Sequence, residues 1–229
     1  MIKILCIIPA RSGSKGIPNK NIKIYNGKPL IYWTINQAKS CKHINNMRII
    51  VSTDHDYYKQ IALEHGAEVP FLRPSNISGD LSTDYEFMKH AVDWLQNNEN
   101  YIPDIILHLR PTSPLRKIQD IDNALEIFIK NKHEYDSLRS VVLNEKSPYK
   151  MYNIYDNTLV PLFTNINEIN EPYNQCRQIL PKCYLHNGYI DILNTSILYN
   201  KTISGDKILP YLMDNTETND IDEYKDWHN

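Results

Sequence analysis

The sequence lacks an excess of positive charge. Its 229 residues carry 25 lysines and arginines against 27 acidic residues, which gives a formal net charge of -2. Proteins that bind nucleic acid through its phosphate backbone need a clear basic excess. We therefore predict no nucleic-acid partner, and any anion-binding site must be a local cluster of cations.

Long hydrophobic runs are lacking as well. The opening residues, "MIKILCIIPAR", hold too short an apolar run for a signal peptide, and Arg11 and Lys15 interrupt it. No stretch approaches the roughly 18 apolar residues that a membrane-spanning helix needs. From these absences we expect a soluble, cytoplasmic protein with no membrane partner.

Cysteine is scarce, and the motifs of several enzyme classes are missing. The 4 cysteines form no C-x-x-C pair, so neither a zinc site nor a disulfide framework is indicated. No H-x-x-x-H spacing and no G-x-S-x-G elbow is present, which removes support for zinc catalysis and for hydrolytic triads. A Walker A loop and a G-x-G-x-x-G turn are also missing, so P-loop hydrolases and dinucleotide oxidoreductases lose support.

What the sequence does contain is an alternation of strand and helix patterns. Three nearly unbroken apolar runs predict strands buried on both faces of a parallel sheet, at residues 4–9, 48–52 and 105–109. Apolar stripes with helical spacing accompany them, at residues 31–38, 58–65, 87–95 and 118–128. The fold class is therefore α/β, with a Rossmann-like, doubly wound and mostly parallel sheet.

The rhythm changes after Tyr135. The pieces "SLRSVVLN", "MYNIY" and "TLVPLF" are short and β-like, with no strong helix between them, and "YIDIL" and "KILPYLM" predict strands that return to the main sheet. The asparagine-rich residues 164–174 predict a loop. We predict a single domain over residues 1–229 with a small β-rich excursion inserted at about residues 140–185. Because its tyrosines have few partners within the excursion, we expect it to pack on a second copy of the chain in a homodimer.

The segment "IIPARSGSKGIPNKN", which follows the first strand, is the strongest candidate for chemistry. Ligands of open α/β sheets lie beyond the carboxyl ends of the strands. Gly13 and Gly16 let backbone N–H groups approach an oxyanion, and polyphosphate is the ligand that this predicts. Charge is supplied by three cations, Arg11, Lys15 and Lys20. The alternative is a flexible glycine- and serine-containing loop with solvated lysines.

Two further segments are expected at the same edge of the sheet. In "RPTSPLR", two prolines hold Arg110 and Arg116 at a defined spacing, although a rigid turn before the next helix explains the segment equally well. The long polar loop "LRPSNISGDLSTD" suits a binding segment, and Thr83 or Asp84 is expected to cap the helix that follows. Further along the chain, the Asn-Gly pair in "HNG" predicts a hairpin turn.

Near the carboxyl end, "TNDIDEYKDW" contains two aspartates separated by one isoleucine. In an extended segment this spacing points Asp220 and Asp222 to one face, while Ile221 enters the core. Two carboxylates at one edge of a site suit Mg²⁺, which commonly takes one or two carboxylates and the phosphates of a substrate. A solvated acidic tail is the alternative.

These motifs, taken in their order, resemble those of the CTP-dependent acylneuraminate cytidylyltransferases, which activate sialic acid and related nonulosonic acids as CMP-sugars. The resemblance rests on "IPARSGSKGIPNKN", "IIVSTD", "LRPSNISGD", "RPTSPLR", "RQILP", "HNG" and "DID", and it runs over most of the chain. Each motif is weak alone, but the ordered set is specific. The resemblance implies a CTP-binding sheet, a Mg²⁺ requirement and a homodimer in which one subunit's excursion helps close the other's site.

The resemblance also implies the site residues. The nucleotide-binding set is Arg11, Gly13, Ser14, Lys15, Lys20, Asn21, Arg73 and Asp80. The catalytic set is Arg11, Lys15, Asp220 and Asp222, the two aspartates being the Mg²⁺ ligands. The sugar-binding set is Arg110, Lys150, Arg177 and Asn187.

Two departures from the family pattern fall near the expected sugar. The best-known sialic acid enzymes have glutamine where this chain has Arg110, and Arg-Pro-Asn-Gly where it has Leu-His-Asn-Gly at residues 185–188. The CTP half of the prediction is unaffected. The sugar acid stays open between N-acetylneuraminate, legionaminate and another bacterial nonulosonate.

The expected reaction is transfer of CMP from CTP to the anomeric hydroxyl of a nonulosonic acid, with release of pyrophosphate. Such a transfer needs positioning and charge neutralisation, which suits a chain with clustered cations and paired acids. Two alternatives remain: activation of an eight-carbon keto-deoxy sugar acid, and CTP binding without turnover.

Overall fold

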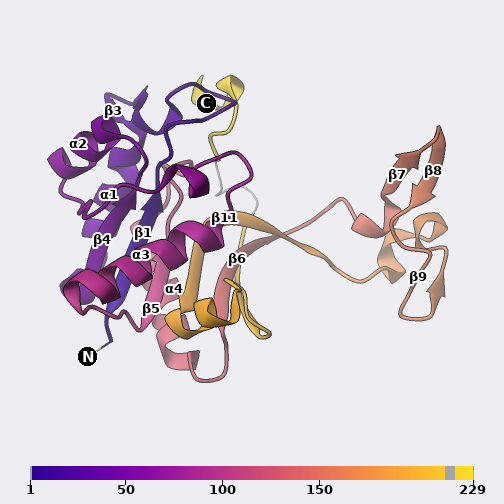
Figure 1. Cartoon of the computed structure of the whole chain (residues 1–229). Helices are drawn as coiled ribbons and strands as arrows, with labels where there is room; N and C mark the ends of the chain where they lie inside the picture. The colour runs from indigo at the N-terminus through magenta and orange to yellow at the C-terminus, as the bar shows by residue number, and fades with distance from the viewer. Residues whose placement is uncertain (1, 215–219, 229) are drawn as a thin grey trace.

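The computed structural model describes residues 2–214 and 220–228, and its centre is a six-stranded sheet in the order β12-β6-β11-β5-β1-β4 (Figure 1). Its strands are β1 (Ile4–Pro9), β4 (Met47–Ser52), β5 (Ile105–His108), β6 (Ser137–Leu143), β11 (Tyr184–Asn194) and β12 (Ile208–Met213). β11 runs antiparallel to β5 and β6, while the other neighbouring pairs of the sheet are parallel. The predicted mostly parallel α/β sheet is confirmed.

Helices cover both faces of this sheet. They are α1 (Leu30–Lys39), α2 (Asp56–Glu64), α3 (Asp84–Glu99) and α4 (Ile118–Asn131). Residues of α1, α2 and α4 share one buried cluster with Ile4, Cys6 and Ile8 of β1, whereas α3 shares another with Leu5 and Ile7. Alternate residues of a strand point to opposite faces, so the unbroken apolar run of β1 is explained by burial on both sides.

Shorter elements connect these layers. A small hairpin, β2 (Ile24–Tyr25) with β3 (Lys28–Pro29), precedes α1. The 3-10 helices are η1 (Lys20–Ile22), η2 (Ile44–Asn46), η3 (Ser75–Ile77), η4 (Pro148–Lys150), η5 (Pro172–Asn174), η6 (Arg177–Ile179), η7 (Thr195–Asn200) and η9 (Tyr224–His228). Throughout the described part of the chain, every helix is too short or too polar to traverse a lipid bilayer.

Between β6 and β11 the chain leaves the sheet and forms a projecting arm, residues 144–183 (Figure 1). The arm contains two hairpins, β7 (Tyr152–Tyr155) with β8 (Thr158–Pro161) and β9 (Asn165–Ile166) with β10 (Ile169–Asn170). The prediction of a plain loop at residues 164–174 is therefore wrong in part. Asn167 and Glu168 take positive φ angles of 44° and 67°, which is the turn geometry that closes a two-residue hairpin.

The predicted hairpin at the Asn-Gly pair is also wrong, because β11 continues through it. The pairing of β11 with β6 shifts register between His186 and Asp191, which marks a β-bulge. Gly188 has a φ of +66°, whereas Asn187 does not adopt a positive φ, so the pair lacks the two positive φ angles of a type I′ turn. One glycine bends the strand without reversing it.

Candidate active site

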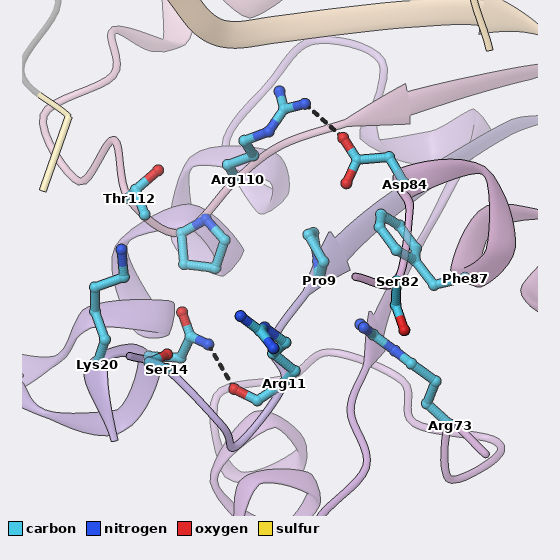
Figure 2. Close-up of a pocket in the computed structure, with 12 residues that line it drawn as sticks. Pro9, Arg11, Ser14, Lys20, Arg73, Ser82, Asp84, Phe87, Arg110 and Thr112 are labelled. Carbon is cyan, nitrogen blue, oxygen red and sulfur yellow. Dashed lines mark hydrogen bonds and ion pairs between the residues drawn. The ribbon is translucent and has the colours of Figure 1, made fainter. Parts of the chain in front are cut away.

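A pocket lies beyond the carboxyl ends of β1 and β5, and residues from four separate segments line it (Figure 2). Of the residues predicted from the sequence, it brings together Arg11, Ser14, Lys20, Asn21, Arg73 and Arg110. Pocket residues that the sequence reasoning did not assign are Pro9, Ser82, Asp84, Phe87, Pro111 and Thr112. Pro9, Pro111 and Thr112 lie within motifs quoted above, and Ser82 and Asp84 lie in the long polar loop. Their place in these segments is the sequence signal that could have indicated a position at the pocket.

The loop after β1 is fixed by side chains from outside it. The Asp54 carboxylate, which follows β4, accepts the Ser12 backbone N–H at 2.8 Å and the Ser12 hydroxyl at 2.9 Å. Within the loop, the buried Asn21 amide donates to the Arg11 carbonyl at 3.1 Å. The loop is therefore held in place by specific hydrogen bonds, which does not fit the flexible alternative.

Arg11 and Lys15 share one carboxylate from the long polar loop. Arg11 Nη1 and Lys15 Nζ each lie 2.8 Å from an oxygen of Asp80. The Lys15 ammonium, and next the Arg11 guanidinium, hold the pKa of Asp80 below its ordinary value. Asp80 thus neutralises both cations in this arrangement, and an incoming phosphate would compete with it. A direct contact between Asp80 and a nucleotide stays a prediction.

Lys20 joins the first loop to the aspartate segment near the carboxyl end. Its ammonium donates to the Ile221 carbonyl at 2.9 Å and to Asp222 Oδ1 at 2.8 Å, across a separation of 202 residues. The Ile221 side chain is buried, and its backbone N–H donates to the Thr112 carbonyl at 2.8 Å. The cationic loop and the twin aspartates therefore meet at one edge of the pocket.

Asp220 and Asp222 are separated by one residue in the aspartate segment, and their predicted role as metal ligands stays a prediction. Burial raises the pKa of Asp220, and the nearby Asp222 carboxylate raises it further. A cation between two such carboxylates would relieve this repulsion. Among residues 2–214 and 220–228, no group of three or more His, Cys, Asp or Glu side chains is placed to hold a metal. Two carboxylates with phosphate and water as the remaining ligands fit Mg²⁺ better than a closed zinc site.

Gly16 is where the first loop touches the aspartate segment. A Cβ at Gly16 would lie 2.5 Å from the Asp222 carbonyl oxygen, whereas a Cβ at Gly13 would meet nothing within 4 Å. The contact at Gly16 is with backbone, so one chain would have to move. Gly13 has no such steric need, which leaves close approach of a ligand as its predicted role.

We therefore expect Gly16→Ala to displace the aspartate segment and lower the free energy of unfolding by about 1–3 kcal/mol. Gly13→Ala is the matched control, because it adds the same methyl group to the same loop without a clash. Urea unfolding of both variants measures the difference. An unchanged midpoint for Gly16→Ala would contradict the contact.

Arg73 is buried and fixed at the opposite side of the pocket. Its Nε donates to Ser52 Oγ at 3.0 Å, and its guanidinium carbon lies 4.8 Å from the centre of the Phe87 ring. Burial lowers the pKa of Arg73 to about 10, which still leaves it protonated at neutral pH. Its Nε and Nη2 already donate to Ser52, and a contact between Arg73 and a nucleoside stays a prediction.

Arg110 is bound by two carboxylates. Its Nη2 lies 2.7 Å from Asp84 Oδ2, and its Nη1 lies 2.7 Å from Asp191 Oδ2 and 3.2 Å from the Gly188 carbonyl. Burial by itself would raise the pKa of Asp191, but its hydrogen bonds to histidines and the Arg110 charge hold it well below its ordinary value. Of the two residues predicted to cap α3, Thr83 does so, which frees Asp84 for the pocket.

For Arg116, the structure favours the alternative of a rigid turn before the next helix. It is buried, and its guanidinium donates to the Tyr189 carbonyl at 2.7 Å, to Gln37 Oε1 at 2.9 Å and to the Arg110 carbonyl at 2.8 Å. Unlike Arg110, Arg116 is not among the residues that line the pocket. Arg116 therefore holds the turn after β5 in shape, while Arg110 faces the pocket.

The rest of the predicted sugar-binding set lies elsewhere. Lys150 and Arg177 belong to the arm, which projects away from the sheet, and Lys150 Nζ donates to the Tyr173 carbonyl at 3.3 Å and the Gln175 carbonyl at 2.5 Å (Figure 1). Asn187 lies in the bulge of β11 and accepts the Ser140 hydroxyl at 2.6 Å. Within a single chain, only Arg110 of this set lines the pocket.

Comparison with known proteins gives consistent results. The family model described as cytidylyltransferase matches residues 5–167. The chain is 33% identical over 227 residues to the N-acylneuraminate cytidylyltransferase of Streptococcus agalactiae serotype V, covering 99% of this chain and 52% of that protein. It is 34% identical over 236 residues to the CMP-N,N'-diacetyllegionaminic acid synthase of Legionella pneumophila, covering 99% of this chain and 94% of that protein.

The chain thus spans about half the length of the streptococcal relative. Among solved structures, CMP:2-keto-3-deoxy-manno-octonic acid synthetase complexed with CTP superposes with a TM-score of 0.67 at 16% identity, covering 96% of this chain and 93% of that one. This likeness supports the fold. From the family model and the relatives, the chain belongs to the cytidylyltransferase family.

Proposed function

We propose that the chain transfers CMP from CTP to the anomeric hydroxyl of a nonulosonic acid and releases pyrophosphate. The observation that carries this proposal is the meeting of Lys20 with Asp222 at 2.8 Å, at the edge of a pocket that Arg11 and Arg73 also line. Cations that would bind a triphosphate line this pocket, and Lys20 links them to the segment whose carboxylates would hold a metal ion. The family membership and the activities for which both relatives are named support the same reaction.

In the reaction, the anomeric oxygen attacks the α-phosphorus of CTP, and the bond between the α-phosphorus and the bridging oxygen breaks. The proton of the hydroxyl passes to solvent water, and pyrophosphate departs with the electron pair of the broken bond. Arg11, Lys15 and Lys20 are the groups that bind the phosphates and stabilise the charge on the leaving pyrophosphate. Arg73, fixed by Ser52, orients the nucleoside.

Asp220 and Asp222 would hold the metal ion, which we propose is Mg²⁺. When bound, Mg²⁺ draws charge from the phosphate oxygens and favours attack at phosphorus. Lys20 pairs with the Asp222 carboxylate in this structure. When that carboxylate holds the metal ion, the Lys20 ammonium would be available to bind phosphate.

The arm suggests that two chains share each site. Its hairpin β7–β8 exposes large apolar side chains, with Ile154 71% and Leu159 62% exposed. Exposed apolar surface of this kind is typical of an interface. We propose a homodimer in which the arm of one chain brings Lys150 and Arg177 to the sugar end of the partner's pocket.

A pyrophosphate-release assay with CTP and Mg²⁺ tests the reaction. The substrates to compare are N-acetylneuraminate, legionaminate, pseudaminate and 3-deoxy-octulosonate. The ranking of kcat/KM identifies the sugar acid, and preference for the octulosonate would favour the eight-carbon alternative. CTP binding without pyrophosphate release from any of them would identify a binding module instead.

Complementation tests the shared site. Lys150→Ala and Asp222→Ala are each expected to be nearly inactive alone, because each removes one half of every site. Co-expressed, they should recover activity in about a quarter of the sites, since half of randomly paired dimers carry one intact site of two. No recovery in proven mixed dimers would place Lys150 and Asp222 in the same chain's site or remove Lys150 from it.

A further inference from the structure

Two residues that follow the aspartates are not explained by the proposed chemistry. Asp226 Oδ2 accepts the backbone N–H groups of Asp222 at 3.1 Å and Glu223 at 2.8 Å. Trp227 packs edge-on against Tyr25, with ring centroids 5.8 Å apart and planes at 86°. Asp226 therefore fixes the backbone of Asp222, and the Trp227 ring fixes the turn that carries Asp222 and Asp226.

Trp227 is anchored on the first part of the chain and not on the pocket. Tyr25 is buried, in a cluster that also contains Ile221. Lys23 Nζ lies 5.7 Å from the centre of the Trp227 ring and 5.3 Å from that of Tyr224, within the range of a cation–π contact. Asp222 is thus bracketed by two anchors, the Ile221 side chain before it and the Trp227 ring after it.

The ion pair between Lys20 and Asp222 is a weak way to hold that carboxylate. The Asp222 side chain is 67% exposed, so water screens its charge even though the Lys20 side chain is only 14% exposed. In the proposed reaction each residue also gains another interaction, because Lys20 binds phosphate and Asp222 binds the metal ion. The pair is then weakened at the moment when Asp222 must stay in place, so other contacts have to position it.

We propose that Asp226 and Trp227, here called the aspartate clamp, are positioning residues that hold Asp222 in the geometry for metal binding. The inference rests on the proposed function. It predicts that the clamp affects metal affinity and turnover more than the metal-free affinity for CTP, because its hydrogen bonds and ring contact are with Asp222, Glu223 and Tyr25. If the clamp were needed for folding alone, its loss would lower metal affinity, turnover and CTP affinity together.

The test measures binding of Mn²⁺ to the protein–CTP complex by water-proton relaxation, beside CTP affinity without metal and the unfolding midpoint. Trp227→Ala is expected to weaken Mn²⁺ binding about tenfold, a loss typical of residues that orient metal ligands. Trp227→Phe should restore most of it, because the ring contact with Tyr25 is kept. Lys225→Ala is the matched control, since it removes the exposed pair with Glu223 but leaves the hydrogen bonds of Asp226 and the Trp227 ring in place.

Wild-type Mn²⁺ affinity in a folded Trp227→Ala variant would overturn the clamp. If that variant does not fold, Asp226→Ala decides, because it removes two hydrogen bonds at the surface and no packing. Should the wild-type complex itself bind no Mn²⁺, the metal assignment falls and the clamp with it. If the wild-type protein releases pyrophosphate and Trp227→Ala has the same Mn²⁺ affinity and turnover, the clamp alone is refuted and the proposed function stands.

Discussion

Replacing Asp222 with alanine is expected to reduce turnover about a thousandfold, while CTP binding weakens much less. The carboxylate would hold a metal ion that stabilises charge in the transition state by several kcal/mol, and each 1.4 kcal/mol is about a factor of ten in rate. The first loop, with Arg11 and Lys15, would still bind the triphosphate. Steady-state pyrophosphate release gives kcat, and calorimetry gives the CTP affinity.

Glu223→Ala is the control for this substitution. It removes an exposed carboxylate one residue away, whose partner is Lys225 at 2.8 Å. The same loss of charge at Glu223 should leave kcat within about twofold, as for a surface substitution away from the chemistry. Unchanged turnover in Asp222→Ala would remove its metal role and separate the aspartates from catalysis.

Arg11→Ala is expected to damage both binding and turnover. Arg11 lines the pocket and is the first cation after β1, so it would contact the phosphates in the ground state and also as charge grows on pyrophosphate. One preorganised donor of this kind contributes roughly 3 kcal/mol, or about a hundredfold in kcat/KM. The expected signature is a higher KM for CTP together with a lower kcat.

The control for Arg11 is Lys42→Ala, which removes a cation paired at the surface with Glu126 at 3.5 Å. Both substitutions change the net charge equally, so a general electrostatic effect would appear in both. Arg11→Lys should recover part of the binding, because charge is kept while the fork of donors is lost. A higher KM with an unchanged kcat would restrict Arg11 to binding and exclude it from the catalytic set.

The central sheet was predictable because its signals are local. The apolar runs of β1, β4 and β5 and the helical stripes after them each carry their own periodicity, and burial on both faces leaves no competing pattern. The hairpin prediction at the Asn-Gly pair was wrong because the backbone conformation of a single residue decides whether the chain turns there. Gly188 alone takes a positive φ in the Asn-Gly pair, so the strand bulges and continues where two such residues would have reversed it.

The candidate site was predictable only in its pieces. The motif order suggested both the cationic loop and the twin aspartates, but nothing in the sequence fixes the contact between Gly16 and the Asp222 carbonyl. Partners such as Asp84 on Arg110 were missed, since a residue at a helix start reads first as a cap. Lys150 and Arg177 illustrate the reverse case, because the arm carries them away from the pocket of their own chain.

The sequence by itself determined the alternating α/β architecture, the edge of the sheet where a ligand is expected, and the residue types available there. Periodicity, glycine placement and charge are properties of short segments, so they can be read without coordinates. The tertiary structure decided which segments touch: it joined Lys20 to Asp222 across 202 residues and turned Arg116 inward while Arg110 faced the pocket. Such contacts depend on how distant segments pack around a common core, and no local pattern encodes that distance.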